Sequence, residues 1–329
     1  MIPSAGASER LDGVAAVSSG DVWAVGSTRA RGYDRALIEH WNGRAWQVVP
    51  APDAGAGHTP LFGVAASAAN DVWAVGHANA TGTLIEHWDG ISWKRVPSPS
   101  ESRADALFAV AAVSPSDAWA VGTNAFQEGG RLYSLIEHWD GKGWTIEQSP
   151  AGEFSLTGIA ATSPTDAWAV GGDAQTHRAL IERWDGTKWR IVPSANLGQG
   201  SSFLAAIDAV SPSDVWAVGH ATRDTDRALV EHWNGSRWKL LPSLQAGAGS
   251  GLAGVAARTA NDVWAVGGSG GATAFHWDGA RLQPVAVAKA TESMLYAVVA
   301  IAADDVWSVG SASANGLLER YSCQHHGAP

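Results

Sequence analysis

The sequence contains a single cysteine, few charged residues and no long apolar run. Cys323 alone cannot form an internal disulfide, and it cannot build a zinc site from cysteine ligands. Charged residues make up 16% of the 329 residues, against about 25% in an average soluble domain. The longest apolar run, Ala106 to Val113, is too short to cross a bilayer, so we expect no transmembrane segment. The N-terminus shows neither the basic region nor the apolar core of a signal peptide.

The charge balance is acidic. The 32 Asp and Glu residues outnumber the 22 Lys and Arg residues, which gives a net charge of −10. Protein surfaces that follow phosphates usually carry an excess of basic residues, so we expect no nucleic-acid partner. Hydrophobic residues make up 46% of the chain, and there are 38 glycines. This composition excludes a fully disordered chain and favours many short strands joined by turns.

All 18 tryptophans occupy one of three columns, that is, equivalent positions in successive copies of a repeat. The first column comprises Trp23, Trp73, Trp119, Trp168, Trp216, Trp264 and Trp307. The second comprises Trp41, Trp88, Trp139, Trp184, Trp233 and Trp277, with Tyr321 in the seventh copy. The third lies five residues later and comprises Trp46, Trp93, Trp144, Trp189 and Trp238. We expect all three columns to be buried between repeats, and the sixth repeat to be looser because Leu282 stands in its third column.

Each copy contains four strand-like runs, which in the second copy are residues 61–66, 72–75, 84–88 and 93–96. Asp89-Gly90 separates the last two runs, and this dipeptide favours a tight hairpin with positive φ at its central residues. No segment shows a sustained helical period. The pattern therefore predicts an all-β, seven-bladed β-propeller of four-stranded antiparallel blades. The repeats begin near residues 11, 61, 107, 156, 204, 252 and 295, and they make one domain of residues 1–329.

The repeated segments resemble a known type. Asp-Val-Trp-Ala-Val-Gly, His-Trp-Asp-Gly-x-x-Trp and Val-Pro-Ser-Pro together resemble tandem repeats of secreted and surface proteins of actinobacteria and myxobacteria. They are also similar to kelch, galactose-oxidase-type and tectonin repeats, and the resemblance covers residues 11–321. It implies a propeller that is secreted or held at the cell surface. It implies no single activity, because such propellers include enzymes, lectins and protein-binding scaffolds. The copper ligands of galactose oxidase have no counterpart here.

The two ends of the chain predict how the ring closes. The seventh copy reaches Tyr321 and the C-terminus without a clear fourth strand. The N-terminal Ile2-Pro3-Ser4 aligns with Val96-Pro97-Ser98, which ends a fourth strand. We therefore expect residues 1–10 to contribute to the last blade, so that the two termini meet there.

One column holds histidines just before the second tryptophan. It comprises His40, His87, His138, His232 and His276, with Arg183 and Arg320 in two copies. Arginine can replace histidine as a hydrogen-bond donor but not as a metal ligand, so we expect no metal here. The column should donate to carboxylates such as Asp71 and Asp117, as a similar Asp/His/Trp network does in WD-repeat propellers. The neighbouring glutamate column, which includes Glu86, is expected to be a frame or surface feature rather than a pair of catalytic acids.

Functional residues should lie where the repeat varies. The connections from the fourth to the first strand and from the second to the third vary most, and in a propeller they share one rim. On that rim, the second residue of each first strand should lie near the mouth of the central channel. This position reads Asp12, Phe62, Phe108, Thr157, Ala205, Ala253 and Tyr296. His77 and His220, directly after second strands, are expected to edge the same mouth.

Asp208 is a second departure from the repeat. Its column otherwise contains alanine or valine, and an unpaired carboxylate there would be costly to bury. It is therefore either hydrogen-bonded within the channel or functional, with Arg258 as a candidate partner.

Three classes of function stay open. The first is a non-catalytic module that binds glycans or proteins through the variable-loop rim and the channel mouth. The second is an enzyme of the hydrolase, lyase or oxidase class with its site at the same mouth. The third is a structural or spacer domain of a longer surface protein. The sequence contains no nucleophile elbow, phosphate loop or metal-spaced cluster, so we favour the binding module. We expect no cofactor, a glycan or protein ligand, and a monomer.

Overall fold

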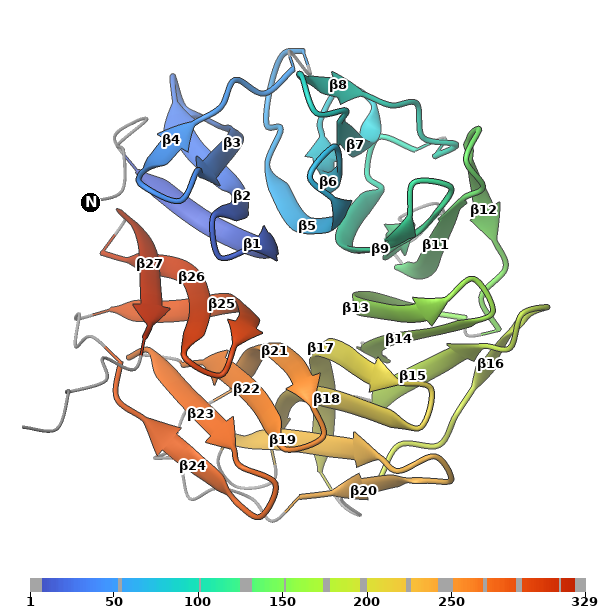
Figure 1. Ribbon diagram of the computed structural model, residues 1–329. Coiled ribbons are helices and arrows are strands. Elements are labelled where there is room, and N and C mark those ends of the chain that lie inside the picture. The colour runs from blue at the N-terminus through green and yellow to red at the C-terminus, as the bar shows by residue number, and fades with distance from the viewer. Residues whose placement is uncertain are drawn as a thin grey trace, which may run out of the picture.

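The computed structural model shows seven antiparallel sheets arranged as blades around a central axis (Figure 1). It describes residues 8–52, 55–100, 102–124, 132–150, 152–173, 178–195, 200–222, 226–241, 251–268, 271–287, 292–313 and 315–322. These ranges contain strands and turns but no helix, as the repeat predicts. Within them, therefore, no helix is available that could span a membrane.

The strands of each blade follow one another from the axis outward. The innermost strands are β1 (Glu9–Ser18), β5 (Leu61–Ala68), β9 (Ala106–Ser114), β13 (Phe154–Ser163), β17 (Ser201–Ser211), β21 (Leu252–Thr259) and β25 (Ser293–Ala302). The second strands are β2 (Asp21–Ala30), β6 (Asp71–Ala78), β10 (Asp117–Asn124), β14 (Asp166–Asp173), β18 (Asp214–Thr222), β22 (Asp262–Gly267) and β26 (Asp305–Ala312).

The third and fourth strands lie on the outside. The third strands are β3 (Tyr33–Trp41), β7 (Gly82–Trp88), β11 (Tyr133–Trp139), β15 (Ala179–Trp184), β19 (Asp226–Trp233), β23 (Thr273–Trp277) and β27 (Asn315–Tyr321). The fourth strands are β4 (Trp46–Val48), β8 (Trp93–Arg95), β12 (Trp144–Glu147), β16 (Trp189–Ile191), β20 (Trp238–Leu240) and β24 (Leu282–Val285). We number the blades 1 to 7 in chain order, so that blade 7 comprises β25, β26 and β27.

The turns between third and fourth strands differ in one respect from the expected hairpin. Trp88 pairs with Trp93, so the loop has four residues rather than two. Only Gly90 has a positive φ, of 90°. The Asp89 carboxylate accepts the backbone N–H groups of Ile91 and Ser92, both at 2.9 Å. The carboxylate thus provides the hydrogen-bond acceptor for two N–H groups of the longer loop.

Every innermost strand contains a β-bulge near its start. In blade 1 the register with β2 shifts between Leu11 and Gly13, which leaves Asp12 without an opposite residue. The same shift leaves one extra residue in each other blade, and these are Phe62, Phe108, Thr157, Ala205, Ala253 and Tyr296. A bulge bends its strand and changes the direction of a side chain. These seven positions form the column that the sequence places at the channel mouth.

The core lies between blades rather than within one. Trp73 of blade 2 packs on Trp139 and Trp144 of blade 3, with ring centroids 5.0 and 5.2 Å apart. The first column is 0–3% exposed and the third column 3–8%. The second column is only half-buried in most blades, contrary to the expectation. The Trp139 indole N–H reaches the Pro115 carbonyl at 3.1 Å near the surface, so this column joins a turn to the core.

In four blades the histidine of this column is hydrogen-bonded to the aspartate that begins the second strand, as expected. In blade 3 the expected bond is absent, because His138 lies 3.5 Å from Asp117. His40 lies 2.8 Å from Asp21, and His87 lies 2.7 Å from Asp71. The imidazole rings of this column also pack on the first-column tryptophans. The ring centroids of His40 and Trp23, for example, are 4.1 Å apart. In blade 4 the arginine at this position, Arg183, approaches Asp166 at 2.6 Å. The column is therefore a structural network that links the second and third strands of each blade.

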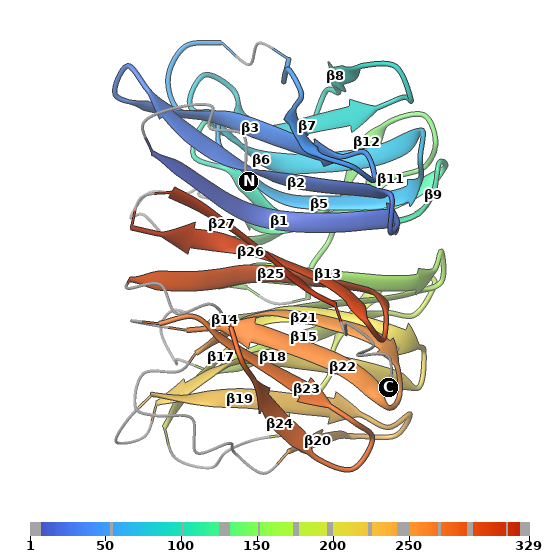
Figure 2. The same cartoon turned by 60° about the vertical axis from the view of Figure 1, so that its left-hand side comes forward.

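Blade 7 differs from the others in the part of the chain that the structure describes. Its sheet contains three strands, with β27 outermost, whereas each other sheet contains four. In Figure 2, β26 and β27 lie beside β1, and β25 also contacts β1, so that blade 7 packs against blade 1. Of the residues expected in the last blade, Glu9 and Arg10 instead begin β1 of blade 1. Residues 1–7 lie outside the described ranges, as do residues 323–329.

Candidate functional site at the channel mouth

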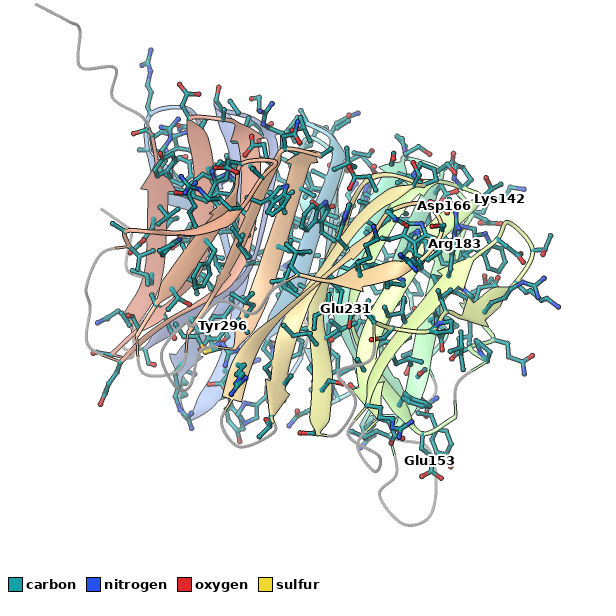
Figure 3. The ribbon with its side chains drawn as sticks, turned by 90° about the horizontal axis from the view of Figure 1, so that it is seen from below. Lys142, Glu153, Asp166, Arg183, Glu231 and Tyr296 are labelled. Atoms are coloured by element: carbon teal, nitrogen blue, oxygen red, sulfur yellow. The ribbon has the colours of Figure 1, made fainter. Side chains whose placement is uncertain are left out.

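Two sets of connections meet at one edge of the ring, which we call the variable rim. The connection from β4 to β5 meets the start of β3, directly after the second-to-third connection of blade 1, where the Thr59 N–H donates to the Asp34 carbonyl at 2.8 Å. Figure 3 shows Glu153, from a fourth-to-first connection, at one edge of the molecule and Lys142, from a third-to-fourth turn, at the other. The Asp166–Arg183 pair lies at the edge of Lys142. The structural network and the variable rim therefore occupy opposite edges.

The seven bulge residues line one cavity on the axis, and we call them the channel ring. The cavity has a volume of about 230 Å³, and the valines and isoleucines two residues further along the inner strands also line it. The bulge explains this convergence, because each extra residue leaves the pairing of its strand and faces the axis. The structure thus brings together Asp12, Phe62, Phe108 and Tyr296 from four different blades.

The channel ring has a bulky half and an open half. Phe62 and Phe108 are neighbours, with centroids 5.6 Å apart and planes tilted by 50°. On the other side of Asp12, the Arg10 guanidinium lies 4.1 Å from the centre of the Tyr296 ring. Blades 4, 5 and 6 contribute only small side chains, which are Thr157, Ala205 and Ala253. The free space of the mouth therefore lies opposite an arc of aromatic rings.

The polar groups of the ring already have partners. Arg10 donates to the Asp12 carboxylate at 2.6 Å. The Thr157 hydroxyl donates to the Leu204 carbonyl at 2.9 Å. Burial raises the pKa of Asp12 to about 6, although the Arg10 charge acts in the opposite direction. Asp12 therefore gains its negative charge as the pH rises through about 6. Above that pH it neutralises the charge of the Arg10 guanidinium, which it contacts.

The two histidines expected at the mouth lie outside this cavity. His77 is hydrogen-bonded to the Asp105 carbonyl at 2.9 Å and to the Asn79 amide oxygen at 3.1 Å. His220 stacks on Phe203, with centroids 5.5 Å apart. The rings of His220 and Phe203 line a separate pocket of about 250 Å³ between blades 4 and 5.

Sequence reasoning missed Phe203, which stands two residues before the ring residue Ala205. A signal was present, since no other copy has an aromatic residue at this position. Gly172 makes room for the ring, because a Cβ atom there would lie 2.5 Å from Phe203.

Asp208 is bound by backbone groups rather than by Arg258. Its carboxylate accepts the N–H of Ala209 at 2.8 Å and the N–H of Ala257, in blade 6, at 2.7 Å. Burial raises the pKa of Asp208, and these two donors partly oppose that effect. Arg258 instead donates to Asp262 at 2.5 Å, so the expected Asp208–Arg258 pair is wrong. Through its hydrogen bond to Ala257, Asp208 links blade 5 to blade 6.

In blades 1 to 5 the glutamate column is buried between blades, so there it is a frame feature rather than a surface one. Glu39, Glu86, Glu137 and Glu182 are 0% exposed, and Glu231 is 1% exposed. Burial raises the pKa of Glu39 and Glu137 to about 7 and that of Glu86 to about 8. These carboxyls lie in different blade interfaces and face no common cavity. Over the ranges that the structure covers, no three His, Cys, Asp or Glu side chains gather as a metal site would require.

Comparison with known proteins supports the fold. No protein-family model and no curated protein matches the sequence. Among solved structures, the chain is similar to YCF48 bound to D1 peptide, with 18% identity, a TM-score of 0.65, and coverage of 98% of this chain and 94% of that one.

Two further solved structures are similar. YCF48 from Cyanidioschyzon merolae has 16% identity and a TM-score of 0.65, with coverage of 98% of both chains. The WD40 β-propeller domain of Doa1 has 12% identity and a TM-score of 0.66, with coverage of 97% of this chain and 95% of that one. The chain therefore has the fold of these β-propellers over nearly its whole length.

Proposed function

We propose that this chain is a protein-binding module whose channel mouth accepts an apolar or aromatic side chain from an extended segment of a partner. The observation that carries the proposal is the channel ring. Seven bulges turn seven side chains toward one cavity, and Phe62 and Phe108 form an aromatic wall on it. A cavity of about 230 Å³ matches one or two side chains of a partner rather than a large cofactor.

The chemistry of the ring favours a protein over a glycan. Sugar recognition needs several polar groups that converge on the ligand and fix its orientation. Here Asp12 and Thr157 already bond to Arg10 and to a backbone carbonyl. The Tyr296 hydroxyl lies 3.1 Å from the Ser311 hydroxyl. What the ring offers to a ligand is aromatic surface, which suits an apolar side chain.

The same cavity supports an enzyme less well. Asp12 is the one carboxylate among the residues that line the described mouth, so acid–base chemistry with two carboxyls lacks its second member there. The structural likeness to YCF48 bound to D1 peptide adds support, because a propeller of the same fold holds a peptide in that structure.

The experiment is selection followed by titration. A phage library of random dodecapeptides is selected on the folded protein, and the enriched peptides are titrated calorimetrically against wild type and the Phe62→Ala, Phe108→Ala double variant. We expect the double variant to lose at least about tenfold in affinity, or about 1.4 kcal/mol. The matched control replaces Ile146 and Ile191, which are 50% and 52% exposed on outer strands, by alanine and should bind as wild type does.

Two results would contradict the proposal. One is an unchanged affinity in the double variant while its circular dichroism matches that of wild type. The other is binding on a glycan array that the same double variant loses, which would assign the mouth to sugars instead.

A further inference from the structure

The pocket between blades 4 and 5 opens beside the channel mouth, and we call it the side pocket. Its volume of about 250 Å³ matches one large side chain. Phe203 and His220 form an aromatic wall on it, with ring centroids 5.5 Å apart and planes 26° from parallel. Ser155, Ser201 and Ser202 line it as well, and all five residues lie within the described ranges.

Two departures from the repeat form the side pocket. Phe203 stands in a column that has no aromatic residue in the other copies, which read Arg10, Pro60, Ala106, Ser155, Gly251 and Met294. In β14 of blade 4, Gly172 leaves room for the ring, because a Cβ atom there would lie 2.5 Å from it. The aromatic wall is therefore fitted into the interface between two blades rather than carried on a loop tip.

The side pocket adjoins the open half of the channel ring. Phe203 lies two residues before Ala205 in β17, and Ser155 lies two residues before Thr157 in β13. A strand rises about 3.3 Å per residue, so the pocket begins about 7 Å from the ring along both strands. These two strands are neighbours around the axis (Figure 1). A segment that leaves the mouth over blades 4 and 5 therefore passes over the side pocket.

The polar groups of the side pocket are available to a ligand, unlike those of the ring. The Ser202 hydroxyl accepts only the Ala179 N–H, at 3.1 Å, within the described chain. The hydroxyls of Ser155 and Ser201 and the ring nitrogens of His220 form no hydrogen bond with the described residues. A ligand here meets aromatic carbon and several hydrogen-bonding groups in one small space.

Tyrosine is the side chain that fits these surfaces. Its ring packs on Phe203 and His220, and its hydroxyl reaches groups that a phenylalanine would leave unpaired. Asp173 also lines the pocket and disfavours an acidic side chain. A sugar ring could use the same groups, but the strands shared with the mouth favour a ligand that occupies both sites together.

We propose that the partner segment carries a second anchor, a tyrosine, whose ring packs on Phe203 and His220 and whose hydroxyl bonds to the serines of the side pocket. This inference rests on the proposed function, since the first anchor occupies the mouth. Side chains on one face of an extended segment recur every two residues, about 6.6 Å apart. The tyrosine therefore stands two or four residues from the apolar anchor in the sequence of the partner.

The first test reads the sequence of the ligand. Among dodecapeptides selected on the folded protein, we expect those that depend on Phe62 and Phe108 to contain a tyrosine at one of these two spacings. Each peptide is then titrated calorimetrically beside forms in which phenylalanine or alanine replaces the tyrosine. We expect phenylalanine to weaken binding about three- to tenfold and alanine at least about tenfold. Equal affinities of the three forms would overturn the second anchor.

The second test changes the protein. Phe203→Ala should weaken binding of the tyrosine peptide at least about tenfold and leave binding of its alanine form unchanged, because that form has no ring to lose. Met294→Ala, at the same repeat position in blade 7, is the matched control and should bind as wild type does. The double variant Ser155→Ala, Ser201→Ala should no longer prefer tyrosine to phenylalanine. Circular dichroism checks that each variant is folded.

The outcomes separate the two proposals. Peptides that lose affinity in the Phe62→Ala, Phe108→Ala variant but bind folded Phe203→Ala as tightly as wild type would overturn the second anchor alone. Peptides that the double variant binds unchanged would contradict the proposed function, and the second anchor with it. A sugar on a glycan array that Phe203→Ala no longer binds, while the double variant still does, would assign the side pocket to glycans and overturn the tyrosine.

Discussion

The first tryptophan column has the same residue in every blade, whereas the residues of the channel ring differ from blade to blade. In the first column every blade has the same residue, and each indole is 0–3% exposed between two blades. In the ring every strand has the same bulge, but the side chains range from alanine to phenylalanine and tyrosine. At the first column, packing between blades favours one size, because a close-packed interface loses stability when the volume of a side chain changes. The ring faces open space, so its residues are free to vary with function.

The largest expected effect breaks a tryptophan column. Trp119 is 0% exposed and packs on Trp184 and Trp189 of the next blade, at 5.1 and 5.3 Å. We expect Trp119→Ala to lower the free energy of unfolding by about 3–5 kcal/mol, through lost burial and the cavity left behind. Chemical denaturation monitored by circular dichroism measures it. Ile91, which is 85% exposed, is the control, since Ile91→Ala should change stability by less than about 0.5 kcal/mol. A loss below about 1 kcal/mol for Trp119→Ala would refute the proposed role of the column.

The next effect concerns pH. The pKa values of Glu39, Glu86 and Glu137 are raised to about 7, 8 and 7 in the folded protein, so the folded state binds more protons than the unfolded state between about pH 4 and 8. Stability should therefore fall as the pH rises from 5 to 8. Asp71 and Asp262, whose pKa values are lowered, act below this window. Urea midpoints across the range test this. A flat or rising profile would show that these carboxyls are ionised at little cost.

A smaller effect follows from comparing interfaces within the glutamate column. Ser98, which follows the fourth strand of blade 2, donates to the buried Glu137 of blade 3 at 2.8 Å. Ala51 stands at the equivalent position after blade 1, and neither oxygen of Glu86 has a hydrogen-bond partner among the described residues. Ala51→Ser would provide the missing hydroxyl. We expect a gain of about 1–2 kcal/mol at pH 8, because hydrogen bonds to charged groups are worth more than neutral ones, and a smaller gain at pH 5, where the carboxyl is protonated. Ala51→Val adds bulk without a donor and is the control. Equal effects of the two substitutions would argue against the hydrogen bond.

The fold could be predicted because the same residue types recur at the same positions in seven copies of the repeat. Trp73, Gly76 and Asp89-Gly90 recur in register, so a chance match at one copy does not decide the outcome. The role of the histidine column was also readable. Arg183 stands in that column, and the structure shows it bonded to Asp166 as His87 is to Asp71. Arginine can donate a hydrogen bond as histidine does, but it is not a metal ligand. Its presence in the column therefore identified the interaction as a hydrogen bond to the aspartate.

The details of the site could be predicted only in part. The column that contains Phe62 was recognised from its variability, but not its cause, because a bulge adds a residue without changing the apolar pattern on either side. The partner of Arg258 was predicted wrongly, since the second bulge of β21 turns this side chain toward Asp262 in the same blade. His77 and His220 were placed at the mouth by their position after the second strands, but their rings contact the Asp105 carbonyl and Phe203 instead.

The ring should contribute less to stability than the columns do. Phe62 and Phe108 contact each other at the wall of an open cavity rather than filling a closed interface. We expect the double replacement by alanine to cost less than about 2 kcal/mol, because the transfer term is lost without a new enclosed void. The measurement is again a denaturation midpoint. A cost as large as that of Trp119→Ala would place both rings in the structural core and weaken their assignment to a ligand.

The smallest expected effect is the sharpest test of the difference between the two regions. Ala253 belongs to the channel ring and faces the open half of the cavity, opposite the aromatic arc. Ala120 is 0% exposed between blades. We expect Ala253→Phe to change the free energy of unfolding by less than about 0.5 kcal/mol, whereas Ala120→Phe should cost about 1–3 kcal/mol or prevent folding through overpacking. The added ring at residue 253 should also block the mouth, so peptides selected on wild type should no longer bind. Retained binding with unchanged stability would move the ligand away from the channel, and a large loss of stability would show that the ring, like the columns, tolerates only one size of side chain.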